Sequence, residues 1–311
     1  MLRGRIAPQL VLLGRCSLDR QESMARMPEE AVTAGIVAAL TLAYSAPMPG
    51  SGSRYSDGQV AHETRMLTVM PLAESLGDSA SQSVGETVLE AVTTSRSFAG
   101  FADLRSAGYL APLARSALRG EPLRLVLRKL GHEDLLLFAR AAGAAGTQGP
   151  LEGAIQVALG AGDETTLREV MRFVSARDPM AREYARNFEI TTQLARPALI
   201  SALSRAESTR AALVHCYLEV LSEVPDLDVT GRAGQREAED VSRMAKGVLK
   251  SGSVFSRRGL QAITNLDGAL RADSRLSPTA TEPAVTAAAF LVTLEHGPES
   301  LNYRVRPARQ R

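Results

Sequence analysis

Apolar residues recur at spacings of three and four along most of this 311-residue chain. That spacing places side chains on one face of a helix, and we find no alternating pattern or Asn-Gly turn of the kind that marks strands. The sequence therefore predicts an all-α fold. The clearest predicted helix is 209–224, whose apolar stripe consists of Leu213, Val214, Tyr217, Leu218 and Leu221.

The composition indicates what fills the core of such a fold. Hydrophobic residues make up 45% of the chain, aromatic residues only 4%, and Trp is absent. A core built from Ala, Leu and Val suits closely packed helices. We expect about a dozen helices in one compact domain spanning roughly 29–297. The run 283–294 is almost entirely apolar, so we expect it to form a helix that is buried on several sides.

Several helix starts are marked by local signals. Ser83–Glu86 and Thr166–Glu169 have the spacing of capping boxes, and Asp178 precedes a proline at a first helical position. We expect Pro71 to kink or break a helix at 62–76. Residues 97–105 are predicted to be irregular, and the glycine-rich break at 143–153 is a candidate flexible lid.

Charge and cysteine usage narrow the class of protein. The net charge is only +2, and much of the arginine excess lies at the two ends. We interpret 1–28 as a disordered basic extension and 298–311 as a basic tail. No basic stripe with interleaved aromatic residues indicates nucleic-acid binding, and no apolar run has the length that spans a bilayer. Two cysteines, Cys16 and Cys216, support neither a disulfide framework nor a zinc site, so the cytoplasm is the default location.

The segment 47–58, PMPGSGSRYSDG, is the first candidate binding loop. Glycine frees backbone N–H groups, and a guanidinium among them suits a phosphate. The candidate phosphate ligands in this loop are the N–H groups freed by glycine, as at Gly50, and the guanidinium of Arg54. The same composition is ordinary in loops between helices, and by itself it favours a loop without a ligand.

A second polar segment follows Pro225. Asp226 and Asp228, with Arg232 close behind, could hold magnesium through oxygen ligands. They could equally cap the next helix or remain solvated. His215 lies one residue from an apolar stripe, so it is either packed in the core or part of a site.

Five segments, in order, resemble the triphosphoribosyl-dephospho-CoA synthase family. The resemblance runs from about 31 to 297 and is strongest at 166–188. The five segments are SVGETVLEAV (83–92), YLAPLARSA (109–117), TLREVMRFVSARDPMAREYARNF (166–188), ALVHCYLEVLSEVPD (212–226) and AAAFLVTLEHG (287–297).

The resemblance implies an all-α transferase that joins ATP to 3′-dephospho-CoA and releases adenine. The product is 2′-(5″-triphosphoribosyl)-3′-dephospho-CoA. The resemblance also implies that ATP is a substrate, used with Mg²⁺, and that no cofactor is covalently bound. It further implies a carboxylate that accepts the hydroxyl proton, for which Asp226 is the candidate. The residues that we expect to bind nucleotide or phosphate are Gly50, Ser53, Arg54, Asp57, Arg182, His215 and Arg232, and those that we expect to bind magnesium are Asp226 and Asp228.

The polar motifs depart from the family pattern. Met48 and Ser51 stand where the first loop has lysine and asparagine, and Arg105 stands where a second motif has glycine. Pro283 and Ala158 replace two aspartates. These changes support an alternative interpretation, in which the chain is a repurposed or inactive paralogue that binds a nucleotide, a CoA-like ligand or a protein partner. A pterin-dependent one-carbon pathway is one such setting.

Overall fold

The computed structural model describes residues 26–55, 60–161 and 164–297. Within those ranges the chain forms fifteen α-helices, one short π-helix and two 3₁₀ turns, and no β-strand. The all-α prediction is confirmed, with more helices than the dozen expected. The α-helices are α1 (Glu29–Ser45), α2 (His62–Gly77), α3 (Val84–Ala99), α4 (Leu104–Arg119), α5 (Leu123–Arg128), α6 (His132–Ala145), α7 (Pro150–Gly160), α8 (Leu167–Val174), α9 (Pro179–Ala185), α10 (Arg196–Leu203), α11 (Thr209–Glu223), α12 (Leu227–Ala233), α13 (Gln235–Lys250), α14 (Arg257–Ala272) and α15 (Thr281–His296).

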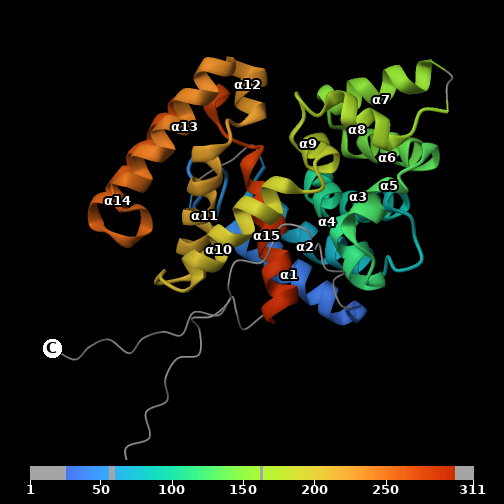
Figure 1. Ribbon diagram of the computed structural model, residues 1–311, viewed down its shortest axis with the longest axis horizontal. Helices are drawn as coiled ribbons and strands as arrows, with labels where there is room; N and C mark the ends of the chain where they lie inside the picture. The colour runs from blue at the N-terminus through green and yellow to red at the C-terminus, as the bar shows by residue number, and fades with distance from the viewer. Residues whose placement is uncertain (1–25, 56–59, 162–163, 298–311) are drawn as a thin grey trace, which may run out of the picture.

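The last helix, α15, is the central element. It lies in the middle of the molecule, with α3–α9 to one side and α11–α14 to the other (Figure 1). It packs against α1, α4, α10 and α11. Every residue from Pro283 to Leu294 is buried, which confirms the expectation of a helix covered on several sides. A cluster of buried apolar side chains extends from Val32 on α1 to Leu294 on α15.

The predicted helix starts at 83 and 166 are confirmed. Ser83 accepts from the backbone N–H of Glu86, and the Glu86 carboxylate accepts from the backbone N–H of Ser83. Thr166 and Glu169 make the same reciprocal pair at the start of α8. Each pair satisfies N–H groups that have no partner inside the helix. Asp178 caps α9 by accepting from the backbone N–H of Ala181 at 2.8 Å.

The predicted irregular segment at 97–105 is shorter than expected, and the break that Pro71 could have caused does not occur. The segment 97–105 is mostly helical, because α3 continues to Ala99 and α4 begins at Leu104. Gly100 ends α3 in the left-handed conformation, and Asp103 caps α4, so residues 100–103 suffice for the turn. The helix α2 runs through Pro71 without a break. At 143–153, α6 ends at 145 and α7 starts at 150.

The expected disordered extension, 1–28, lies outside the described residues except at its end. The backbone N–H of Met27 donates to the carbonyl of Ala117 at 2.9 Å, and Pro28 directly precedes α1. The expected tail at 298–311 is also outside the described residues, as is Cys16. Among the helices that the structure describes, none is long and apolar enough to cross a membrane.

Candidate active site

Asp226 is buried at the start of α12, where it joins two segments that are distant in sequence. Its Oδ1 accepts from the backbone N–H groups of Asp228 and Val229, at 3.0 and 3.1 Å. Its Oδ2 accepts from the backbone N–H of Ala280 at 3.0 Å and from the hydroxyl of Thr281 at 2.9 Å. The carboxylate therefore caps α12 and also holds the start of α15 beside it.

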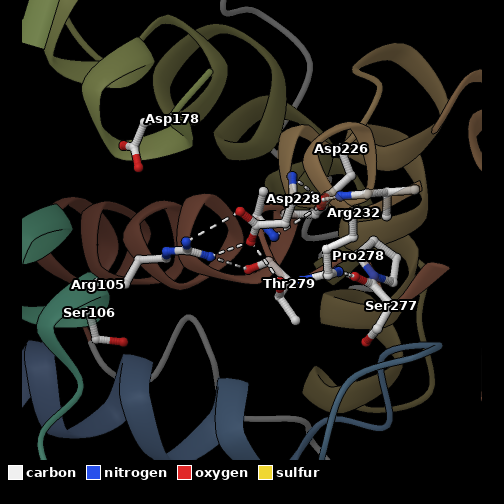
Figure 2. A network of polar contacts seen from close by, with 12 residues as sticks. Arg105, Ser106, Asp178, Asp226, Asp228, Arg232, Ser277, Pro278 and Thr279 are labelled. Carbon is white, nitrogen blue, oxygen red and sulfur yellow. Dashed lines mark hydrogen bonds and ion pairs between the residues drawn. The ribbon is translucent and has the colours of Figure 1, made fainter. Parts of the chain in front are cut away.

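Asp228 is paired with an arginine from α4. Arg105 donates through Nη1 to Oδ2 at 2.5 Å and through Nη2 to Oδ1 at 3.3 Å. The Thr279 hydroxyl donates to the same Oδ2 at 2.6 Å. Burial raises the pKa of Asp228, but the guanidinium and the hydroxyl lower it further, so the net shift is downward. In Figure 2, Arg105 reaches from α4 across to α12, and Asp178, directly before α9, points toward it.

The first glycine loop docks against the segment before α15. The backbone N–H of Gly50 donates to Asp267 Oδ1 at 2.8 Å, and its carbonyl accepts from the Ser277 hydroxyl at 2.6 Å. Gly50 has a φ of +77°, and an added Cβ would lie 2.8 Å from Cδ of Pro278. Only glycine meets both conditions without strain. The Gly50 backbone therefore binds protein groups in this conformation.

The remaining polar residues of the loop have separate surroundings. The Ser53 side chain is buried, and its Oγ accepts from the backbone N–H of Tyr55 at 3.2 Å. Arg54 is exposed, with its guanidinium carbon 5.5 Å from the centre of the Tyr55 ring. Asp57 lies outside the described residues. Met48, which replaces the family's lysine, is 1% exposed and belongs to the apolar core.

A small pocket lies between α9, the end of α11 and the start of α15. Its volume is about 20 Å³, little more than one water occupies, so a substrate can enter only if the surrounding elements separate. It brings together two carboxyl groups, Asp226 and Glu183, with Arg182 and Tyr109. The other lining residues are Pro179, Ile190, Val220, Val224, Pro225, Leu227, Ala280, Thr281 and Ala284.

The two carboxyl groups of this pocket differ in proton affinity. Burial raises the pKa of Glu183 to about 8, against which the hydrogen bond from the backbone of Thr191 acts only partly. Glu183 Oε2 is buried and has no hydrogen-bond partner among the residues that the structure describes. Burial and the neighbouring Asp228 raise the pKa of Asp226 to about 6. At neutral pH the pocket therefore contains one carboxylic acid and one carboxylate.

The paired aspartates, as folded, do not fit a magnesium ion. A carboxylate offers about four acceptor positions, and those of Asp226 are taken by four hydrogen bonds. Asp228 is already paired with the guanidinium of Arg105, so a cation occupies the position where Mg²⁺ would bind this carboxylate. In the described part of the chain, no three His, Cys, Asp or Glu side chains are grouped to hold a metal.

Two further predicted residues lie apart from the pocket. His215 faces η2 (Ser253–Phe255), where its Nδ1 is 2.8 Å from the Ser253 hydroxyl and its ring packs edge-on against Phe255. Arg232 donates to the carbonyls of Arg275 and Ser277 and to the Thr279 hydroxyl, so its guanidinium holds the 275–279 segment. Of the predicted binding residues that the structure describes, Arg182 is the one that lines the same pocket as Asp226.

Sequence reasoning missed Glu183 as a site residue and the Arg105–Asp228 ion pair. Glu183 lies in the best-matching segment, 166–188, but a single glutamate on a short helix has no distinctive spacing. Arg105 and Asp228 are separated by more than a hundred residues, so no local pattern relates them.

Comparison with known proteins agrees with this architecture. Residues 30–301 match the CitG family model, described as ATP:dephospho-CoA triphosphoribosyl transferase. A curated protein of Malonomonas rubra, assigned as a 2-(5″-triphosphoribosyl)-3′-dephosphocoenzyme-A synthase, is 30% identical over 115 residues. That match spans 36% of this chain and 36% of the relative's length.

A solved structure has the same fold. The crystal structure of an Archaeoglobus fulgidus protein, assigned as a triphosphoribosyl-dephospho-CoA synthase, superposes with a TM-score of 0.57 at 22% identity. The superposition covers 76% of this chain and 99% of that one. Because the family model matches most of the chain, the protein belongs to the ATP:dephospho-CoA triphosphoribosyl transferase family.

Proposed function

We propose that this protein joins ATP to 3′-dephospho-CoA and releases adenine, at the pocket that Asp226 and Glu183 line. The observation that carries the proposal is the pair of carboxyl groups whose pKa values burial raises to about 6 and about 8. Two neighbouring carboxyl groups with separated pKa values are suited to act as a base and an acid at the same pH.

In this reaction the 2′-hydroxyl of 3′-dephospho-CoA attacks C1′ of the ATP ribose, and the bond from C1′ to adenine N9 breaks. Asp226, ionised at neutral pH, accepts the hydroxyl proton at Oδ2, where the entering hydroxyl replaces that of Thr281 as donor. Glu183, protonated at neutral pH, donates its proton to the departing adenine. One proton is gained and one is lost, so the pair returns to its starting state by exchange with water.

The cation at this pocket is Arg182. It is half-buried on α9, and burial and the neighbouring Arg186 lower its pKa. A guanidinium there is suited to a phosphate oxygen of the triphosphate. Since the two aspartates, as folded, do not fit Mg²⁺, we assign no reaction step to a metal ion at these residues.

The first test incubates the full chain with ATP, Mg²⁺ and 3′-dephospho-CoA and measures adenine by chromatography and the product by mass. Catalytic adenine release that requires both substrates supports the proposal. Failure to release adenine would refute it, and a rise in melting temperature with ATP alone would then favour a binding paralogue.

The second test changes each carboxyl group without changing its shape. We expect Asp226→Asn and Glu183→Gln to lower kcat by roughly 10²-fold or more, the usual contribution of acid–base groups. Asparagine also caps helices well, so Asp226→Asn leaves α12 capped. Asp78→Asn and Glu133→Gln, both at exposed positions, are the matched controls. Wild-type rates in either active-site variant would remove that residue from the mechanism.

The pH dependence distinguishes the two roles. We expect kcat/KM to rise as Asp226 ionises near 6 and to fall as Glu183 ionises near 8. In Asp226→Asn the rise on the acid side should disappear from the residual activity, whereas in Glu183→Gln the fall on the basic side should disappear. A flat profile in the wild type would contradict both assignments.

A further inference from the structure

A second pocket, lined by arginines, lies between α5, α8 and the end of α9. Its volume is about 170 Å³. Arg124 and Arg128 come from α5, and Arg168 and Arg172 come from α8. None of the four is among the residues for which the sequence predicted a role.

No carboxylate in the described part of the chain pairs with any of the four guanidinium groups. Within the described ranges, none of them forms an ion pair or a hydrogen bond with another residue. The nearest carboxylate on α8, Glu169, is engaged in the capping box, and its pKa is lowered mainly by the hydrogen bonds from Thr166 and less by Arg168 and Arg172. The pocket therefore carries a net positive charge.

The spacing of the arginines along each helix makes their mutual repulsion unfavourable to the stability of the fold. Both pairs are four residues apart, which places like charges side by side on one face of each helix. Such pairs destabilise a helix, and here two of them border one pocket. A bound anion would offset that repulsion.

The pocket is also shielded from water on one side. Leu127, Leu130, Met171 and Tyr184 are buried residues that contribute to its lining. Next to such a surface the interaction between a guanidinium and an anion is stronger than in bulk water. Asn187, at the rim, adds an amide group.

We propose that this arginine pocket binds a diphosphate group. Arginine forms paired hydrogen bonds with phosphate oxygens, and four of them match a multiply charged anion better than a single carboxylate. The volume is below the roughly 300–1,000 Å³ of pockets that enclose whole small molecules. It therefore accommodates a phosphate chain, either as free pyrophosphate or as the end of a nucleotide or CoA-like molecule.

Calorimetric titration of the full chain with inorganic pyrophosphate tests this proposal. We expect saturable binding at low ionic strength that weakens about tenfold or more in Arg128→Ala/Arg172→Ala. The matched control is Arg140→Ala/Arg236→Ala, which removes two exposed helical arginines outside the pocket and should bind like the wild type. Without ligand, the pocket variant should melt at or above the wild-type temperature, because like charges have been removed.

A second readout is the melting temperature with pyrophosphate, which should rise in the wild type and the control and not in the pocket variant. Absence of binding to the wild type, or equal binding to the pocket variant, would overturn the proposal.

Adenine release by the pocket variant then identifies the source of the diphosphate. Release with a raised KM for ATP or 3′-dephospho-CoA assigns the pocket to a substrate's phosphate chain, and unchanged release assigns it to a free anion. Since pyrophosphate binding is measured without turnover, it can fail or succeed independently of the transferase proposal.

Discussion

At the residue scale, Glu183 shows how burial changes the pKa of a side chain in a way that the sequence alone does not predict. An exposed glutamate is ionised at neutral pH, whereas this one is 2% exposed and its pKa is raised to about 8. Loss of hydration destabilises the charged form more than one backbone hydrogen bond can offset. The same burial that suits Glu183 to donate a proton also reduces the stability of the fold at high pH.

We expect the stability of the fold to depend on pH through Glu183. Because its folded pKa lies above the unfolded value of 4.5, its favourable contribution is complete below 4.5 and is lost as pH rises toward 8. The loss is roughly 1.4 kcal/mol per pH unit across that window. Glu183→Gln stays neutral, so urea unfolding should show its stability relative to wild type increasing with pH. For the exposed control Glu133→Gln, we expect the difference in unfolding free energy from the wild type to be the same at both ends of this pH window. The same result for Glu183→Gln would contradict the raised pKa.

At the scale of the element, short polar motifs determine where helices start. A buried carboxylate can then bind backbone N–H groups at the starts of two helices at once. Asp134 accepts from the backbone N–H of Gly131 at 2.9 Å and from that of Gly85 at 2.8 Å. One side chain thus satisfies the N-termini of both α6 and α3. An added Cβ on Gly85 would lie 2.8 Å from the Asp134 backbone, so glycine permits this close approach.

The capping box of α3 provides the prediction at this scale. We expect Ser83→Ala to destabilise the fold by about 1 kcal/mol, because the backbone N–H of Glu86 loses its acceptor. Ser97→Ala, near the end of the same helix at an exposed position, is the control and should change stability little. Chemical denaturation of both variants measures the difference. Equal stability of the two would show that water replaces the cap without cost.

At the scale of the whole molecule, the site is assembled from parts that lie far apart in the chain. Arg105 on α4, Asp228 on α12 and Thr279 before α15 meet in one network (Figure 2). This ion pair lies beside Asp226 and offsets part of the charge of the two aspartates. Removing the arginine should therefore affect both the stability of the fold and the proton affinity of the pocket.

A double-mutant cycle tests the coupling. We expect Arg105→Ala to destabilise the fold by roughly 2 kcal/mol, less than for a fully buried pair because the Arg105 side chain is 33% exposed. Adding Asp228→Ala should recover part of that loss, since the uncompensated carboxylate is then gone. Additive effects in denaturant unfolding would mean that the two side chains are not energetically coupled.

The sequence by itself determined the helical class, the capping boxes at Ser83 and Thr166, the burial of 283–294 and the family. These follow from periodicity and from contacts between residues three or four apart. Only the tertiary structure decided that Asp226 shares a pocket with Glu183, that Gly50 docks beside Pro278, and that the arginines of α5 and α8 border one pocket. Each of these depends on which helix faces pack together, and a carboxyl group's pKa depends on the burial that such packing produces.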